Sequence, residues 1–294
     1  MQHPRSNIAA GKSGPLVLAG PIRYKPQISI NSFTNTVRID PFLGFGIVAE
    51  IGMMDLFEDH RFNGGVYFLT DFRTTHFYGE YQYLKKRFDL RIGYEKKGIL
   101  TADERLLYRL NLHEATATFS YPLSYSTSIR AIPRLAATRF TPINTITLPD
   151  ATTEFAGMGG EIVFDNTLPI GINMIEGIRA KAGVVDYRGI GQKGENFNKL
   201  YLDIRHYQKL HRQIIWANRM SYGHSFGLAA KRYLIGGMNN WFGSSTETPL
   251  PVNFFEHPGE LFFTEFATPL RGFSYIARMG HKVILFNSEL RVPI

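Results

Sequence analysis

The stretch Phe88-Asp-Leu-Arg-Ile-Gly-Tyr94 decides the fold class of this chain. Every second residue from Phe88 to Tyr94 is apolar or aromatic, and the residues between them are charged or small. Successive side chains of a β-strand point to opposite faces of a sheet, so the segment predicts a strand with one apolar and one polar face. A helix would need its apolar residues at a spacing of three or four.

The same alternation returns along the chain. It recurs in the segments 77–83, 115–121, 161–165, 178–184 and 200–205. The polar face repeatedly carries charged residues such as Glu80, Lys181 and Asp203. A soluble β-sandwich also alternates, but it would bury one face of each strand, where charges are costly. An apolar face opposite a charged face, strand after strand, is typical of a membrane barrel with a wet lumen, and a soluble β-sandwich binding module stays open as an alternative.

Composition restricts the class further. Of the 294 residues, 44% are hydrophobic and 14% are aromatic, yet no long apolar block occurs. The most apolar run, 42–54, is interrupted by Glu50 and is shorter than the roughly 20 residues of a transmembrane helix. A barrel strand needs only about 9 to 11 residues, so a transmembrane β-barrel remains possible.

Charge and cysteine usage exclude several kinds of site. The net charge of +8 fits nucleic acid, anionic lipid or a lumen rich in arginine and lysine. The 33 basic residues are spread along the chain without a concentrated patch, which argues against a nucleic-acid partner. The absence of cysteine excludes disulfides and zinc–thiolate sites, and the scattered histidines offer no obvious set of metal ligands. We therefore predict no cofactor and no metal.

Strand counting gives the predicted organisation. About eleven strands precede a connector at 236–280, and a twelfth follows it. The expected strands are 25–32, 45–53, 63–70, 76–83, 88–96, 114–121, 128–140, 158–165, 178–188, 199–210, 213–222 and 281–291. Residues 1–24 carry no secretory signal and read as a linker from an upstream domain, so residues 25–294 are expected to form the barrel part.

Three motifs in the last third of the chain resemble the BamA, TamA and two-partner-secretion barrels, the bacterial surface antigen superfamily. The first is Arg232-Tyr-Leu-Ile-Gly236-Gly237, at the start of the connector. The second is Pro269-Leu270-Arg271-Gly272-Phe273, inside it, which resembles the arginine-bearing tip of the family's sixth extracellular loop. The third is Asn287-Ser-Glu289-Leu-Arg291-Val-Pro293, which resembles the strand after that loop.

The resemblance implies a fold and a function. The fold is an all-β antiparallel transmembrane barrel, with about twelve of an expected sixteen strands present and a long lumen-folded loop before the last one. The missing strands, and the lack of the terminal aromatic residue that a barrel ending carries, make the chain look truncated after Ile294. The implied function is insertion of outer-membrane proteins, or translocation of proteins across the bacterial outer membrane.

The implied partners follow from that function. They are outer-membrane lipid, unfolded protein clients, and possible periplasmic or lipoprotein subunits. In the family, the first and last strands meet at a weak seam, and an edge strand there can pair with a client strand by β-augmentation. The first strand, from about Lys25, would be that edge.

The resemblance also assigns roles inside the lumen. Arg271 would be the loop tip that contacts an acidic residue of the lumen wall, and Glu289 is the partner that we expect. Strand parity supports this choice, because Ile284, Phe286, Leu290 and Val292 share the lipid-facing side and Asn287, Glu289 and Arg291 share the other. Arginine and carboxylate can pair in bidentate fashion in a confined lumen. Gly272 would permit a close backbone approach and Phe273 would wedge the loop against the wall, while Leu270 completes the tip.

Two other functions stay open. One is a barrel that anchors, or exports, an attached periplasmic hydrolase or propeller. The other is an outer-membrane enzyme, for which Gly223-His-Ser225-Phe-Gly227 has the spacing of a nucleophile elbow. That motif needs a sharp strand-to-helix turn, and the following residues read as strand or loop, so we predict that the protein is not an enzyme.

Overall fold

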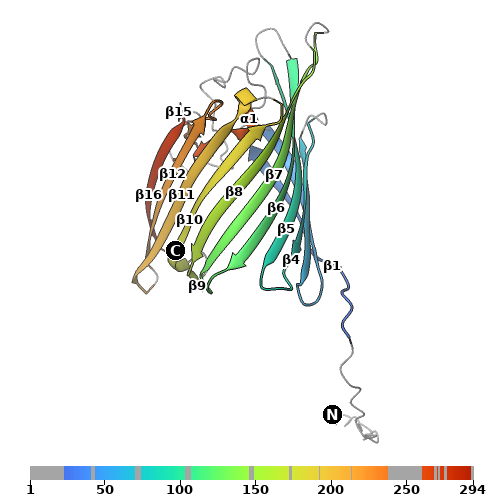
Figure 1. Cartoon of the computed structure of the whole chain (residues 1–294). Helices are drawn as coiled ribbons and strands as arrows, with labels where there is room; N and C mark the ends of the chain where they lie inside the picture. The colour runs from blue at the N-terminus through green and yellow to red at the C-terminus, as the bar shows by residue number, and fades with distance from the viewer. Residues whose placement is uncertain are drawn as a thin grey trace, which may run out of the picture.

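The computed structural model describes residues 23–40, 44–69, 74–102, 107–145, 149–171, 174–191, 193–212, 214–237, 260–267, 270, 272–274 and 277–292. One antiparallel sheet dominates them and curves into an open barrel wall (Figure 1). Its strands follow the order β1-β2-β3-β4-β5-β6-β7-β8-β10-β11-β12-β16. The all-β, antiparallel fold expected from the alternating segments is therefore confirmed.

The bounds of the elements are as follows. The first half of the sheet comprises β1 Ser29–Asp40, β2 Gly44–Met54, β3 His60–Leu69, β4 His76–Tyr83, β5 Asp89–Ala102, β6 Leu107–Pro122 and β7 Thr127–Pro142. The second half comprises β8 Ala151–Asp165, β9 Leu168–Gly171, β10 Met174–Gly189, β11 Phe197–His211, β12 Ile214–Gly227 and β16 Lys282–Arg291. The connector between β12 and β16 contains β13 Tyr233–Ile235, α1 Glu260–Phe263, β14 Glu265–Ala267 and β15 Arg278–Gly280, and η1 Lys193–Glu195 precedes β11.

The predicted strands agree with this path, with corrections at their ends. The long connector lies between the eleventh and twelfth strands of the main path through the sheet, which leaves out the short β9, as expected. The first strand begins at Ser29 rather than near Lys25, and β5 and β6 are longer than predicted because they continue beyond the apolar band. The short elements β9, β13–β15 and α1 were not foreseen, because none is long enough to show a periodic pattern. No helix among the described residues is long and apolar enough to cross a membrane.

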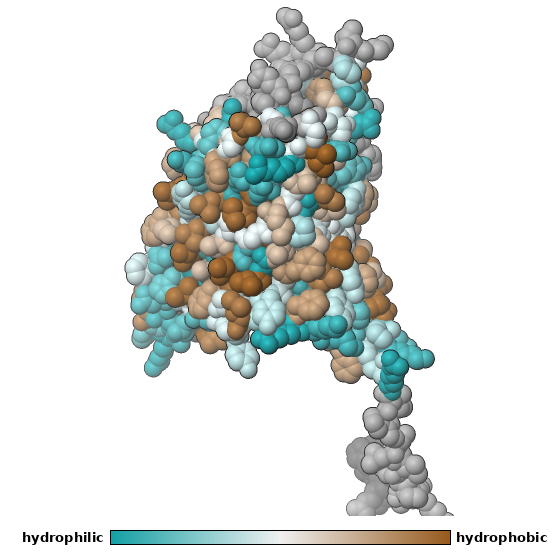
Figure 2. Space-filling model, viewed as in Figure 1, coloured by the Kyte–Doolittle hydropathy of each residue, from teal (hydrophilic) through white to brown (hydrophobic). Residues whose placement is uncertain are grey.

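The outward face of the sheet is apolar and exposed. Ile92, Leu135 and Phe286 lie on this face and are 49%, 60% and 66% exposed. Figure 2 shows hydrophobic side chains gathered across the middle of the wall and hydrophilic ones along its lower rim. Water would penalise so large an apolar surface, whereas lipid would not, so the face suits contact with a bilayer.

A bulge keeps this pattern intact in β1. The register between β1 and β2 shifts between Ile30 and Ser32. The extra residue lets Ile30 and Phe33, three positions apart, both lie on the exposed apolar face. Without the shift, the strict period of two would turn one of them into the lumen.

Tyr24, which precedes β1, contacts the turn between β2 and β3. The Tyr24 hydroxyl donates a hydrogen bond to Asp55 at 3.0 Å, and its ring packs edge-on against Phe57 at 4.5 Å. Asp55 is 1% exposed and also accepts a hydrogen bond from the His60 amide at 2.9 Å. Tyr24 therefore belongs structurally with the sheet; residues 1–22 of the expected linker lie outside the described part of the chain.

The sheet is open between its two outer strands. Within the described residues, β1 pairs only with β2, and β16 pairs only with β12. The interior side is partly filled, because buried aromatic and aliphatic residues from β6, β7, β8, β10 and β11 form a core cluster against α1. The filled side identifies the concave face as the lumen.

We expect Ile92→Lys, on the outward face of β5, to lower the free energy of unfolding in lipid by about 2–4 kcal/mol, because it places a charge in hydrocarbon. The matched control is Thr116→Lys on the neighbouring strand, which faces a lumen cavity lined by Glu80, Glu95 and Glu114. Urea unfolding of the folded protein in lipid nanodiscs measures both. Equal tolerance of the two lysines would show that the outward face does not meet lipid.

Candidate functional site

The two glycines at the start of the connector meet the expected loop-tip motif. The Gly237 amide donates to the Phe273 carbonyl at 3.2 Å, and the Leu270 amide donates to the Gly237 carbonyl at 3.0 Å. Gly236 has a φ of +128°, and a Cβ there would collide with the Ser274 carbonyl. Glycine is needed at this position for both reasons. The structure thus joins two motifs that are more than thirty residues apart.

Arg271 lies outside the described residues, so the expected ion pair of the loop tip stays a prediction. Glu289 accepts a hydrogen bond from Arg291 at 3.4 Å across the same face of β16. Asn287, Glu289 and Arg291 are half-buried, while Ile284 and Leu290 are 73% and 62% exposed, so the predicted parity of this strand is confirmed.

Two details of the loop tip differ from the expectation. Gly272 has a left-handed φ of +82°, but no atom of the described residues lies within 4 Å of the position of a Cβ. Its requirement is therefore conformational and not a close approach. Phe273 is 59% exposed and does not wedge the loop against the wall.

A different aromatic residue performs the wedging. Phe263, at the end of α1, is 6% exposed and packs in the lumen against a ring cluster of the wall. Its ring lies 5.1 Å from Phe155, 5.1 Å from Tyr187 and 5.2 Å from Phe197. Aromatic contacts at these distances contribute beyond the burial of area. The connector is thus seated in the lumen by α1.

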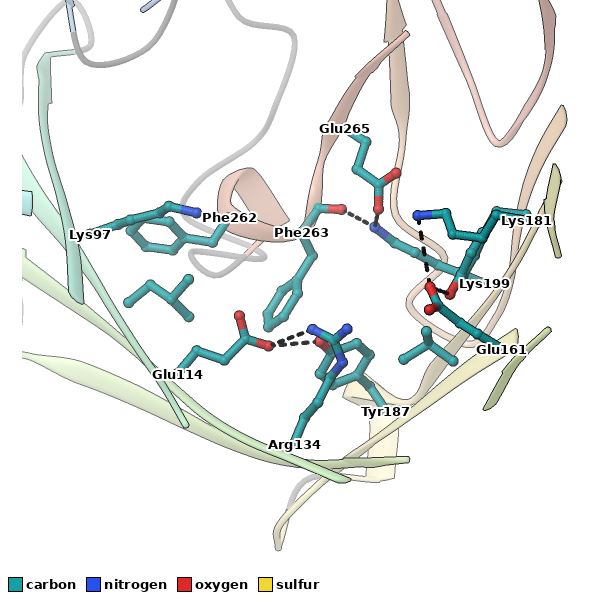
Figure 3. A pocket seen from close by; sticks show the side chains of 13 residues that line it. Lys97, Glu114, Arg134, Glu161, Lys181, Tyr187, Lys199, Phe262, Phe263 and Glu265 are labelled. Carbon is teal, nitrogen blue, oxygen red and sulfur yellow. Dashed lines mark hydrogen bonds and ion pairs between the residues drawn. The ribbon is translucent and has the colours of Figure 1, made fainter. Parts of the chain in front are cut away.

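A buried lysine fixes the same segment by polar contacts. Lys199 on β11 is 7% exposed, and its ammonium donates to the Phe263 carbonyl and to Glu265, both at 2.6 Å (Figure 3). The carbonyl at the end of α1 is one of those that a helix leaves without an internal partner, so a cation there satisfies it. Removing the ammonium would take a hydrogen-bond donor away from both that carbonyl and the Glu265 carboxylate.

A second lysine holds the beginning of the connector. Lys231 is 2% exposed, and its ammonium lies 3.6 Å from the Glu195 carboxylate and 5.0 Å from the centre of the Phe197 ring. Its backbone amide donates to Ser225 at 2.8 Å. Ser225 therefore has a structural contact inside β12 and does not sit on the strand-to-helix turn of a nucleophile elbow.

The wall around Phe263 carries a network of paired charges. Glu114 on β6 accepts hydrogen bonds from Arg134 at 3.3 Å and from the Tyr187 hydroxyl at 3.0 Å. Together with residues from β5, β8 and β11 they line a cavity of about 290 Å³ next to α1 (Figure 3). Side chains of both charge signs line this cavity, so it is a polar space.

Glu161, on β8, forms the other half of the network. It accepts a hydrogen bond from Tyr201 at 2.5 Å and lies 3.7 Å from Lys181 and 3.5 Å from Arg130. The Tyr201 ring lies over Gly183 of the neighbouring strand, where a Cβ would stand 2.5 Å from its hydroxyl. A glycine at this position lets the ring lie flat on the wall and carry its hydroxyl to the carboxylate.

Sequence reasoning missed Lys199, Phe263 and Glu265. The signal for Lys199 was its parity, since it shares the inward face of its strand with Tyr201 and Asp203. The signal for Phe263 was the aromatic pair Phe262-Phe263 inside an otherwise irregular connector. No group of three acidic or histidine side chains that could hold a metal ion occurs among the described residues.

Comparison with known proteins supports the fold. No protein-family model matches the chain, and no curated protein matches it. A solved structure, BamA from Haemophilus ducreyi lacking POTRA domains 1-3, superposes with a TM-score of 0.50 at 11% sequence identity. The match covers 70% of this chain and 47% of that one, so the chain matches about half the length of the solved protein.

At this identity the likeness concerns the fold alone. The order and pairing of the strands, the outward apolar face and the connector seated in the lumen are all properties of this chain. Together with the BamA neighbour they define a BamA-like β-barrel fold, open in this structure between β1 and β16.

Proposed function

We propose that this chain is an outer-membrane barrel of the BamA-like type, which assists the insertion of outer-membrane proteins or the translocation of proteins across the outer membrane. The observation that carries the proposal is the first strand of the sheet. All side chains from Ser29 to Arg38 in β1 are exposed, and the strand has a partner on one side only within the described residues. Its other edge offers unpaired backbone groups that can pair with an added strand.

The lumen supports the proposal. An unfolded or partly folded client must not enter or leak through the barrel uncontrolled, and the connector occupies this space through Phe263 and Lys199. The proposed partners are outer-membrane lipid, unfolded client proteins, and periplasmic or lipoprotein subunits. The role is mechanical: backbone pairing and membrane contact require no bond-making group and no cofactor.

Cross-linking tests the edge. Because the chain has no cysteine, Asn35→Cys on β1 introduces a single reactive thiol. We expect a disulfide or short cross-link to form with a cysteine placed in the last strand of an outer-membrane protein undergoing assembly, since strands that pair lie about 4.8 Å apart. The cross-linked product is measured by gel shift in intact cells.

The matched control is Ala117→Cys, which lies on an interior strand paired on both sides. Absence of a product from Asn35→Cys, in a protein that reaches the outer membrane, would reject the templating role. It would favour the second function, a barrel that anchors or exports a domain attached to it.

We expect Lys199→Met to release the connector from the lumen wall. The change keeps most of the length of the unbranched side chain but removes the contacts of the ammonium with Phe263 and Glu265. Planar-bilayer recording should then show larger or longer openings than the unmodified protein. Lys181→Met is the control, because Lys181 also lies on the lumen wall but its ion-pair partner Glu161 keeps Arg130 and Tyr201. Equal conductance of the two variants would contradict the inference that Lys199 holds the connector in the lumen.

The loop-tip pair proposed by the family resemblance is tested by a double-mutant cycle. Arg271→Ala and Glu289→Ala should each lower insertion activity and thermal stability, and the double variant should lose no more than the worse single one if the two residues act as a pair. Thermal unfolding of the four proteins gives the coupling. Additive losses would show that Arg271 and Glu289 do not act as a pair.

A further inference from the structure

The outward faces of four adjacent strands change from apolar to polar at nearly one level, and the change on β7 comes one outward position further along than on its neighbours. On β5 the change comes after Tyr94, and on β6 it comes above Ala115. On β7 it comes after Ala137, and on β8 it comes above Ala156. In each strand the outward positions on one side of this level are apolar or small, and those beyond it begin with Lys96, His113, Arg139 and Glu154 respectively. This level marks the edge of the apolar band at the end of the barrel that carries the long connector (Figure 1).

Two cations, Lys96 and Arg109, and the imidazole of His113 lie at or beyond this edge on β5 and β6. Lys96 and His113 are direct partners in the register of the two strands. Arg109 lies on the same face of β6, two residues beyond Asn111 and four beyond His113. The Lys96 ammonium lies 5.8 Å from the centre of the Phe77 ring. The Tyr94 hydroxyl lies 2.7 Å from Nδ1 of His113. Aromatic rings therefore lie directly beneath Lys96 and His113, on the apolar side of the edge.

The cations of this cluster are not neutralised by the protein. Among the described residues, no ion pair joins Lys96 or Arg109 to a carboxylate, and Nε of Arg109 is buried without a hydrogen-bond partner. Their neighbour Arg139 differs, since it is paired with Asp150 at 2.6 Å. The nearest outward carboxylate on the same row belongs to Glu154, two strands away from His113. The outward edge of β5 and β6 thus keeps unpaired positive charge next to apolar rings.

From this arrangement we propose that Lys96 and Arg109, with the imidazole of His113 beside Lys96, bind the phosphates of one lipid headgroup in the membrane leaflet at the connector end of the barrel. Lysine and arginine supply charge-assisted hydrogen bonds to phosphate oxygens. Phe77 and Tyr94 hold the acyl chains of the same lipid below the phosphate, as amphipathic rings do at membrane interfaces. The inference rests on the proposed membrane location and adds a defined lipid site to it.

A lipid is the occupant that fits the surface. The cluster lies at the border of a face whose exposed residues are apolar, so a ligand bound there meets hydrocarbon on one side and water on the other. The two basic side chains on neighbouring strands stand about four residues apart along the strand direction, or roughly 14 Å. A lipid with more than one phosphate can therefore engage both.

Binding is tested with lipid A in nanodiscs of phosphatidylcholine. The protein, extracted from its native membrane, is placed in nanodiscs with added lipid A, and bound lipid is counted by native mass spectrometry. We expect the variant Lys96→Gln/Arg109→Gln to retain about tenfold less lipid A than the unmodified protein, because two charge-assisted contacts are lost. Lipid A whose phosphates have been removed should bind the unmodified protein as weakly as the variant binds lipid A.

The matched control is Lys209→Gln/Arg212→Gln, which removes two exposed basic charges at the opposite end of the barrel. It should retain lipid A like the unmodified protein. Equal retention by Lys96→Gln/Arg109→Gln, or equal binding of dephosphorylated lipid A, would overturn the site. Circular dichroism of each variant verifies that the sheet has formed. The proposed function is tested separately, and it fails if the protein is absent from the outer-membrane fraction of its own cells. That result would not affect the lipid-binding measurement, because the nanodiscs supply the lipid.

Discussion

Backbone pairing is the constraint on which the rest of this structure depends. A chain that faces hydrocarbon must satisfy every amide and carbonyl internally, and a sheet does so only by pairing each strand on both sides. From β2 to β12 the main sheet meets this condition, and its strict period of two then forces apolar residues outward and charged residues inward. The bulge in β1 shows the strength of the constraint, because one extra residue keeps Ile30 and Phe33 on the same face.

The inward charges create a second requirement, because a charge in a confined lumen must find a partner. Glu114 and Glu161 meet it through arginine, lysine and tyrosine side chains on adjacent strands. Lys199 meets it through the connector, by binding the carbonyl at the end of α1 and the Glu265 carboxylate. The connector therefore completes the electrostatics of the wall, and the wall in turn gives an otherwise irregular segment a fixed seat.

Strand identity and facing were predictable because both follow from local alternation. The assignment of Glu289 to the lumen side and Ile284 to the outer side is an example, since it needs only parity within one strand. Strand ends were less predictable, as in β5 and β6, because polar residues continue these strands beyond the apolar band. The candidate site was foreseen only in part: the inward facing of Asn287, Glu289 and Arg291 was predicted, but Phe263 and not Phe273 is the buried ring.

By itself the sequence determined the all-β class, the number and order of the long strands, and which face of each strand is apolar. Those properties depend on residues next to one another, so the period of two is enough to reveal them. Only the tertiary structure decided that Lys199 reaches Phe263, sixty-four residues later, and that the two glycines of the connector bind the loop tip. Such contacts depend on how the sheet curves and where the connector re-enters it, and no pattern within a single segment encodes that path.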